Sequence, residues 1–235
     1  MISATSSVNV SYDPQLEAAL FMRKVYAFMS AGLGVTALTA WLVANSVTMQ
    51  QLIFGNRLVF YGLLFAELGM VVVFSSMVRK MSASNAAILL FCYAIVNGMT
   101  LSIIFLLYTH ASIFTTFLVT SATFGTMSIY GFFTHRDLTS FGNILMMGLV
   151  GVIIASVVNI FTHSPALYWA VTYLGVFVFT GLTAYDTQKI KDMNTLGGNG
   201  GPGEDTKLAL SGALMLYLDF VNLFLLLLRL FGRRR

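Results

Sequence analysis

Charged side chains are scarce in this sequence. Asp, Glu, Lys and Arg make up only 9% of the 235 residues, whereas 57% are hydrophobic. A soluble domain needs charge on roughly a quarter of its residues to cover its surface. The low charge therefore excludes an ordinary soluble domain and indicates a chain that crosses a membrane several times.

Cysteine is almost absent, since Cys92 is the only one and lies within an apolar run. No disulfide, CxxC pair or thiolate metal cluster can therefore form within the chain. The first twenty residues lack the basic start and apolar core of a cleavable signal peptide, so we expect the first span to remain as an anchor.

Motifs for enzymatic chemistry are also missing. The glycine-rich segment 196–205, LGGNGGPGED, is not followed by the Gly-Lys-Ser/Thr of a phosphate loop, and no His-Glu-x-x-His or serine–histidine set occurs. We therefore expect a flexible linker at 196–205 and no enzyme. The net charge of +4 comes from loops and tail, so it indicates topology and not a nucleic-acid partner.

Seven apolar stretches, each about as long as a bilayer span, account for most of the chain. They lie at 25–46, 58–78, 83–108, 111–132, 142–162, 165–188 and 207–229. They lack the strict alternation of barrel strands, and a lipid-exposed backbone must satisfy its own hydrogen bonds. The sequence predicts an all-α membrane protein with a polar cytoplasmic tail (1–24), a seven-helix membrane domain (25–229) and a basic carboxyl-terminal tail (230–235).

Basic residues predict the orientation of these spans. If the amino terminus is cytoplasmic, eight of them lie inside: Arg23, Lys24, Arg79, Lys80, Arg136, Lys189, Lys191 and Lys207. Among the loops only Arg57 lies outside, which fits the positive-inside rule. Seven spans then place the carboxyl-terminal arginines outside, against the rule. Either earlier spans fix the orientation and the tail is tolerated, or the last segment re-enters; we predict full crossing and an external carboxyl terminus.

Three acids fall within the predicted spans: Glu67, Asp186 and Asp219. Asp219 lies near the middle of the last span, where an acidic side chain costs about 2.5–3.5 kcal/mol. No lysine or arginine lies deep in a span to neutralise these acids, so each must hold a proton, bind a cation or face water. The alternative for Asp219 is a protonated acid bonded to a neighbouring helix, and Asp186 could reach interfacial water. Asn222 shares the helix face of Asp219, where an asparagine is more often an interhelical hydrogen bond than a ligand.

Two acidic segments carry a family resemblance. Residues 181–191, GLTAYDTQKIK, end the sixth span, and residues 216–225, LYLDFVNLFL, fill the seventh. Together with Arg136-Asp137-Leu138 after the fourth span, they resemble the Bax inhibitor family, the transmembrane Bax-inhibitor-motif proteins, and in particular its bacterial inner-membrane members. The likeness extends over most of the chain. It implies a multi-pass inner-membrane protein whose seven-helix bundle has the last helix at its centre.

The resemblance also implies roles for single residues. Asp186 and Asp219 would form a di-aspartyl pair that senses pH in a proton-sensitive calcium leak and provides the calcium site. Glu67 corresponds to an acidic position in the second span, and Arg79, or its neighbour Lys80, falls near a basic residue that latches the sixth-span aspartate. The glycine-rich loop between the paired spans is longer here than in compact family members, which leaves the gating geometry on the inner side open.

Three functions remain as hypotheses. The first is a pH-sensitive calcium leak channel, since calcium favours carboxylate oxygens; its partners would be the lipid bilayer and calcium or protons, with no cofactor beyond calcium as a bound or permeant ion. The second is a regulatory protein that modulates a membrane-bound protease or a stress response. The third is a small-solute transporter, although no deep basic residue is present to hold an organic anion.

Overall fold

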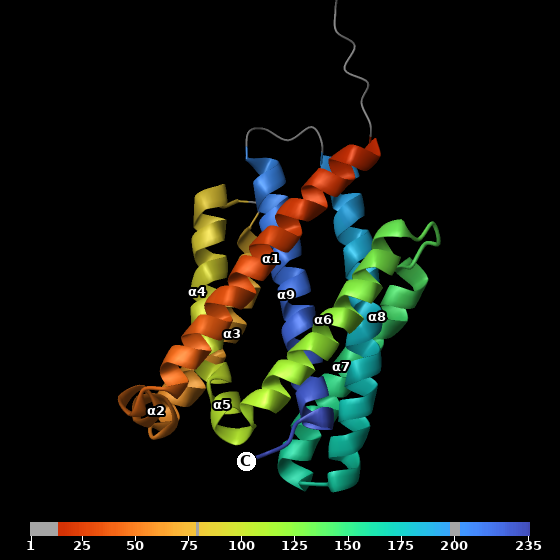
Figure 1. Cartoon of the computed structure of the whole chain (residues 1–235). Coiled ribbons are helices and arrows are strands. Elements are labelled where there is room, and N and C mark those ends of the chain that lie inside the picture. The colour runs from red at the N-terminus through yellow and green to blue at the C-terminus, as the bar shows by residue number, and fades with distance from the viewer. Residues whose placement is uncertain (1–13, 79, 198–202) are drawn as a thin grey trace, which may run out of the picture.

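The computed structural model describes residues 14–78, 80–197 and 203–235, and the regular structure of this part of the chain is helical (Figure 1). Seven of its helices are long and apolar enough to cross a membrane. The predicted fold class, an all-α membrane protein with seven spans, is confirmed.

The helices follow one another through short connections. Their bounds are α1 (Pro14–Ala44), α2 (Val47–Phe54), α3 (Arg57–Met77), α4 (Ala83–Leu101), α5 (Ile103–Leu107), α6 (His110–Phe133), α7 (Thr139–Thr162), α8 (Pro165–Gly197) and α9 (Glu204–Phe231). The short helix α2 links the first two spans, and α5 prolongs α4. The helix α1 begins about ten residues before the predicted span, because the apolar side chains of Ala18, Phe21 and Met22 are buried against the bundle.

Side chains at the helix starts satisfy backbone N–H groups that have no partner within the helix. Ser46, Asn56, Ser82 and Thr109 accept such hydrogen bonds at the starts of α2, α3, α4 and α6. At the α7–α8 turn His163 adopts the left-handed conformation, with φ of 47°. These local signals let spans of about twenty residues reverse within a few residues.

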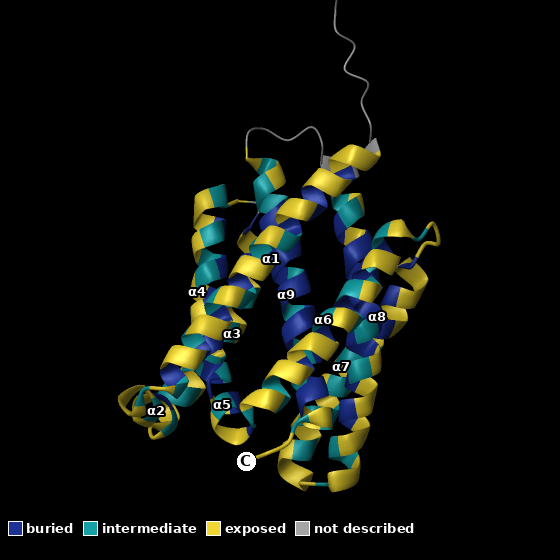
Figure 2. Ribbon diagram, viewed as in Figure 1, coloured by how far each residue is buried: buried dark blue, intermediate teal, exposed yellow. Residues whose placement is uncertain are grey.

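The last helix is the most buried span. Of its most apolar window 61% is buried, against 6% for α3 and for α7, and Figure 2 shows the contrast along the ribbons. The helix α9 packs against α1, α4, α6 and α8. The finer expectation, that all six other spans surround it, stays a prediction.

Glycines allow two pairs of helix backbones to approach closely. A Cβ at Gly98 of α4 would lie 2.6 Å from the carbonyl oxygen of Thr36 on α1, and one at Gly131 of α6 would collide with the carbonyl of Ala184 on α8. Small residues at helix contacts are typical of membrane bundles. The helix pairs α1/α4 and α6/α8 are therefore closely packed, and each of these helices contacts α9.

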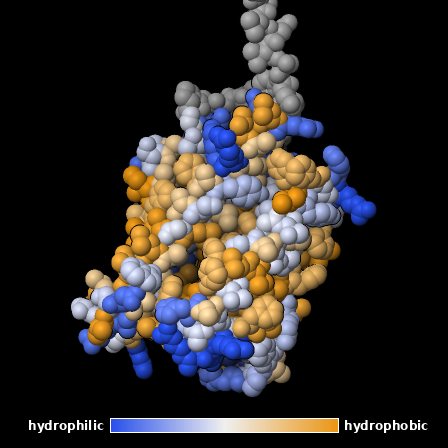
Figure 3. Space-filling model, in the orientation of Figure 1, coloured by the Kyte–Doolittle hydropathy of each residue, from blue (hydrophilic) through white to orange (hydrophobic). Residues whose placement is uncertain are grey.

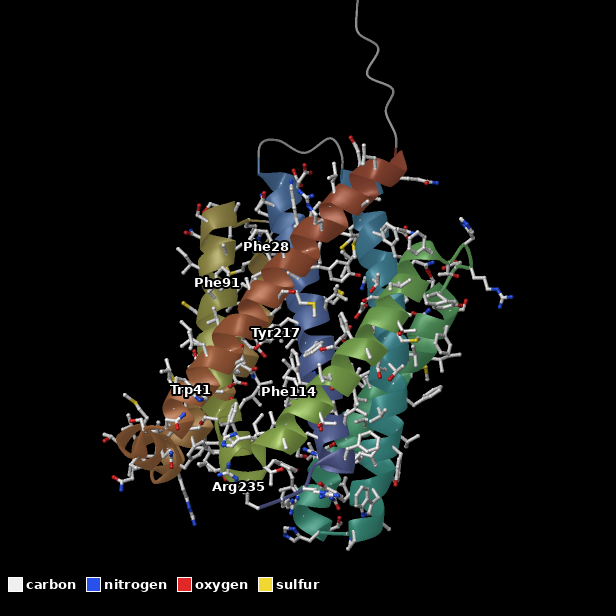
Figure 4. The ribbon with its side chains drawn as sticks, in the orientation of Figure 1. Phe28, Trp41, Phe91, Phe114, Tyr217 and Arg235 are labelled. Atoms are coloured by element: carbon white, nitrogen blue, oxygen red, sulfur yellow. The ribbon has the colours of Figure 1, made fainter. Side chains whose placement is uncertain are left out.

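The chain end lies at the face of the bundle opposite the start of α1 (Figure 1). There the tail pairs with the connection between α5 and α6: Thr109 N–H donates to Arg233 O at 3.1 Å, and Arg235 N–H donates to Leu107 O at 2.9 Å. Figure 4 labels Arg235 at this end. The helix α9 is continuous over 28 residues, which is long enough to cross a membrane; that it crosses fully and does not re-enter stays a prediction. Which face is cytoplasmic stays a prediction.

Candidate functional site

Two aspartates from consecutive spans meet inside the membrane domain. The side chains of Asp186 on α8 and Asp219 on α9 lie next to each other and line the same cavity. Only 8% of Asp186 and 5% of Asp219 is exposed. A carboxylate cannot donate, so a hydrogen bond between two carboxyl groups requires that one of them carry a proton. The structure thus brings together the pair that the sequence singled out.

One oxygen of this pair has no partner. Asp219 Oδ2 is buried and accepts no hydrogen bond from an N–H or O–H donor among the described residues. Buried polar atoms are normally paired, because an unpaired one has lost its hydration without compensation. A proton or a cation at this oxygen would remove the deficit, so the atom marks where such a ligand fits.

The pair opens onto a cavity of about 590 Å³. Its walls come from α3, α7, α8 and α9, and they are mainly apolar. Its polar lining comprises Ser156, Asp186, Lys189, Asp219, Asn222 and Arg229. Lys189 belongs to the carboxyl-terminal half of α8 and Arg229 to the last turn of α9, so the cavity extends past the two acids in both directions.

Asn222 contributes an amide beside the acids. Its Nδ2 donates to Leu218 O at 2.8 Å, and its carbonyl oxygen is the atom that could accept a cation in the cavity. The described residues contain no cluster of three or more His, Cys, Asp or Glu side chains that could hold a metal. Calcium takes six to eight oxygens, so a calcium ion at two carboxylates and one amide would keep most of its ligands as water.

Gln188 joins the carboxyl-terminal part of α8 to the α6–α7 connection. Its Oε1 accepts from Leu138 N–H at 2.9 Å, and its Nε2 donates to Arg136 O at 2.9 Å. Within the same connection Asp137 accepts from Thr139 N–H at 2.8 Å, and hydrogen bonds to Thr139 lower the pKa of Asp137. Arg136 and Leu138 therefore bind α8 through their backbone groups, at a glutamine two residues after Asp186.

Glu67 lies in a different polar site. Its two carboxylate oxygens accept from Thr100 Oγ1 at 2.6 Å and Asn97 Nδ2 at 3.1 Å. Asn97 Oδ1 in turn accepts from the Tyr217 hydroxyl at 2.8 Å, which lies 2.6 Å from Thr36 Oγ1. This chain of hydrogen bonds, here called the tyrosine network, links α1, α9, α4 and α3. Figure 4 shows Tyr217 on α9 behind α1.

The residues predicted from the sequence divide between these two sites. Asp186, Asp219 and Asn222 share one cavity, whereas Glu67 belongs to the tyrosine network and does not line that cavity. Arg79 lies outside the described residues. Three residues of these sites were not predicted from the sequence: Tyr217, Asn97 and Gln188. The available signal was a polar residue inside an apolar span, and Tyr217 and Gln188 both lie within the two acidic segments.

Comparison with known proteins finds one family model and several bacterial relatives that match most of the chain. The family model described as "Inhibitor of apoptosis-promoting Bax1" matches residues 18–235. The chain is 50% identical to the inner membrane protein YbhL of Escherichia coli (strain K12), over 95% of each protein. It is 42% identical to a protein of Rickettsia prowazekii, over 98% of this chain and 96% of the relative. A Borreliella burgdorferi protein is also 42% identical, over 92% of each.

Proposed function

Because this chain belongs to the Bax inhibitor family, we propose that it is a pH-sensitive calcium leak channel of the inner membrane, gated by Asp186 and Asp219. The observation that carries the proposal is the contact between two buried carboxyl groups, one of which has an oxygen without a partner. Two carboxyl groups in contact and away from water are stable only if one positive charge offsets their repulsion, and a proton or a cation can supply that charge.

The proton holds the site closed. With one proton on the pair, the carboxyl groups hydrogen-bond to each other and join α8 to α9. Loss of that proton leaves two negative charges in contact in a medium of low dielectric, where their repulsion is strong. The helices must then separate or take up a cation, and binding of one Ca²⁺ releases the shared proton. Protonation reverses both effects, so calcium flux should rise as pH rises through the range in which the proton is lost.

The cavity beside the pair provides the route. It runs past Asp219 and Asn222 between Lys189 and Arg229. Its walls are mainly apolar, so an ion crossing it depends on the few polar groups and on water. A site with only two carboxylates binds calcium weakly, and weak binding suits conduction because the ion must also leave.

Flux measurements in liposomes test the proposal. Purified protein is reconstituted with a calcium indicator inside, and the initial influx is measured over a pH series for the wild type, Asp186→Asn and Asp219→Asn. Asparagine keeps the shape and removes the titrating group, so each variant should lose the pH dependence. Glu67→Gln is the control, since it removes a membrane carboxylate from the separate tyrosine network and should keep the pH response.

Two outcomes would contradict the channel. The first is wild-type protein that passes no calcium at any pH although it is correctly folded. The second is a normal pH response in both aspartate variants. Either result would favour the regulatory function, because a protein that modulates a membrane-bound protease need not conduct ions.

A further inference from the structure

A second hollow lies on the other side of α9, between α1 and α6. Two cavities of about 790 Å³ and 450 Å³ share Leu33, Ala37, Phe117 and Phe220 among their lining residues. They therefore form one continuous groove, here called the α1–α6 groove, with Phe220 of α9 at its floor. Figure 3 shows the surface hollowed between the two helices, and Figure 4 labels Phe114 on its α6 side.

Small residues line both walls of this groove. The wall from α1 has Ser30, Gly34 and Ala37, and the wall from α6 has Ser121, Gly125 and Ser128. A Cβ at Gly34 or at Gly125 would meet nothing within 4 Å, in contrast to the close contact at Gly98. Small residues in membrane helices normally bring helices together. Here they leave open space, with a volume typical of a ligand site.

The charge at the mouth of the groove is positive. Arg23 lines the larger cavity near the start of α1. Lys191 Nζ donates to Phe132 O at 2.8 Å and lies 5.6 Å from the centroid of the Phe132 ring, and Phe132 lines the same cavity. Among the described residues that line the two cavities there is no aspartate or glutamate. The groove is thus a mainly apolar slot, with the cation of Arg23 in its lining and that of Lys191 close to Phe132.

We propose that the α1–α6 groove binds an anionic glycerophospholipid, with one acyl chain along Phe117 and Phe220 and the phosphate paired with Arg23. The apolar walls alone cannot select a lipid, because the surrounding acyl chains are equally apolar. Selection comes from the headgroup, since basic residues between membrane helices attract anionic lipids. The proposal does not depend on calcium conduction, which concerns the cavity on the opposite side of α9.

Lipid retention tests the headgroup contact. Protein purified in a mild detergent is supplied with equal amounts of phosphatidylglycerol and phosphatidylcholine, and native mass spectrometry measures the bound ratio. The wild type should retain phosphatidylglycerol preferentially, and Arg23→Gln should lower that preference about fivefold, as expected for one basic residue. Lys24→Gln is the matched control, because Lys24 is the next residue on α1, is exposed and does not line the groove.

A second pair of variants tests the apolar slot. Gly125→Leu should fill the groove and lower retention of both lipids, whereas Gly62→Leu, at an equally open position on α3 outside the groove, should leave retention unchanged. Circular dichroism and gel filtration establish that each variant is folded, and Arg23→Gln alters only an exposed side chain. Competition by glycerol phosphate, which has no acyl chain, should be weak.

Three results would overturn the proposal. Retention of as much phosphatidylglycerol by folded Gly125→Leu as by the wild type would place the lipid elsewhere. Equal loss of preference in Arg23→Gln and Lys24→Gln would indicate diffuse surface charge and no defined site. Full displacement by glycerol phosphate would indicate a phosphate site without an acyl-chain groove.

Discussion

Tyr217 and Asp219 lie two residues apart on α9 and extend into different polar sites. The Tyr217 hydroxyl donates to Asn97 Oδ1 on α4, whereas the Asp219 carboxyl contacts Asp186 on α8. Residues separated by two positions point about 200° apart around a helix. One turn of α9 therefore serves two sites on opposite sides of the helix, and substitutions in the two sites should have separable effects.

The Tyr217→Phe substitution should lower stability without changing the pH response. It leaves the buried Asn97 Oδ1 without its donor and removes the contact with Thr36, and an unsatisfied buried group costs about 1–3 kcal/mol. Thermal unfolding in detergent measures the loss, with Tyr173→Phe on the exposed face of α8 as the control. Wild-type stability in Tyr217→Phe would mean that the tyrosine network contributes nothing.

The Asp186→Asn and Asp219→Asn substitutions should be strongly non-additive. Both remove the same shared proton, so the double variant should lose no more pH dependence than either single variant. Residues in one hydrogen-bonded unit typically show interaction energies of about 0.5–3 kcal/mol in a double-mutant cycle. Stability and calcium flux measured on all four proteins provide the cycle, and additive effects would contradict a coupled pair.

Much of the fold follows from the sequence because the bilayer imposes a length on each span. Seven apolar runs predict seven helices, and an acid in the middle of such a run predicts a site. The eight residues of α2 are too few for that signal and were missed. The extension of α8 beyond residue 188 was missed for a related reason, because its last turns are polar and carry no hydropathy signal.

Contacts between distant segments were not predictable in the same way. Tyr217 and Asn97 are 120 residues apart, and nothing in either apolar run specifies which helices become neighbours. Glu67 illustrates the consequence. It is an acid at membrane depth like Asp219, yet the packing of α3 on α4 gives it donors from Thr100 and Asn97. The sequence indicated three buried acids but not that they form two sites.

Alanine substitutions at two glycines should change stability in opposite directions, because one glycine packs against another helix and the other faces open space. Alanine at Gly98 places a Cβ 2.6 Å from Thr36 O, so α1 and α4 must separate; overpacking of this kind typically costs about 1–3 kcal/mol. Alanine at Gly69, where nothing lies within 4 Å, should stabilise the helix by about 0.5–1 kcal/mol. Unfolding midpoints of both variants check the prediction, and a neutral Gly98→Ala would contradict the close approach of the two helices.

The α6–α7 connection should loosen in acid. Hydrogen bonds to Thr139 lower the pKa of Asp137, so the ionised side chain stabilises the turn. A lowered folded pKa contributes stability that is present above the unfolded value of about 3.9 and is lost as pH falls through the folded pKa. Hydrogen exchange at Thr139, corrected for the intrinsic effect of pH, should accelerate below about pH 4. Asp137→Asn should remove this dependence; an identical profile in both proteins would show that Asp137 does not control the turn.

The carboxyl terminus should lie on the external face. The helix α9 has 28 residues, which at 1.5 Å per residue gives a length of about 42 Å, more than the hydrocarbon thickness of about 30 Å. Its tail is held by backbone hydrogen bonds to the α5–α6 connection, and hydrogen bonds to the Tyr108 side chain raise the pKa of Arg234. The arginines that break the positive-inside pattern thus follow six earlier crossings and are fixed to a loop.

A reporter active only in the cytoplasm should be silent when fused at residue 235 and active when fused after Asp137, in the opposite connection. The reverse pattern would invert the topology, and activity at both positions would show that α9 does not cross the membrane.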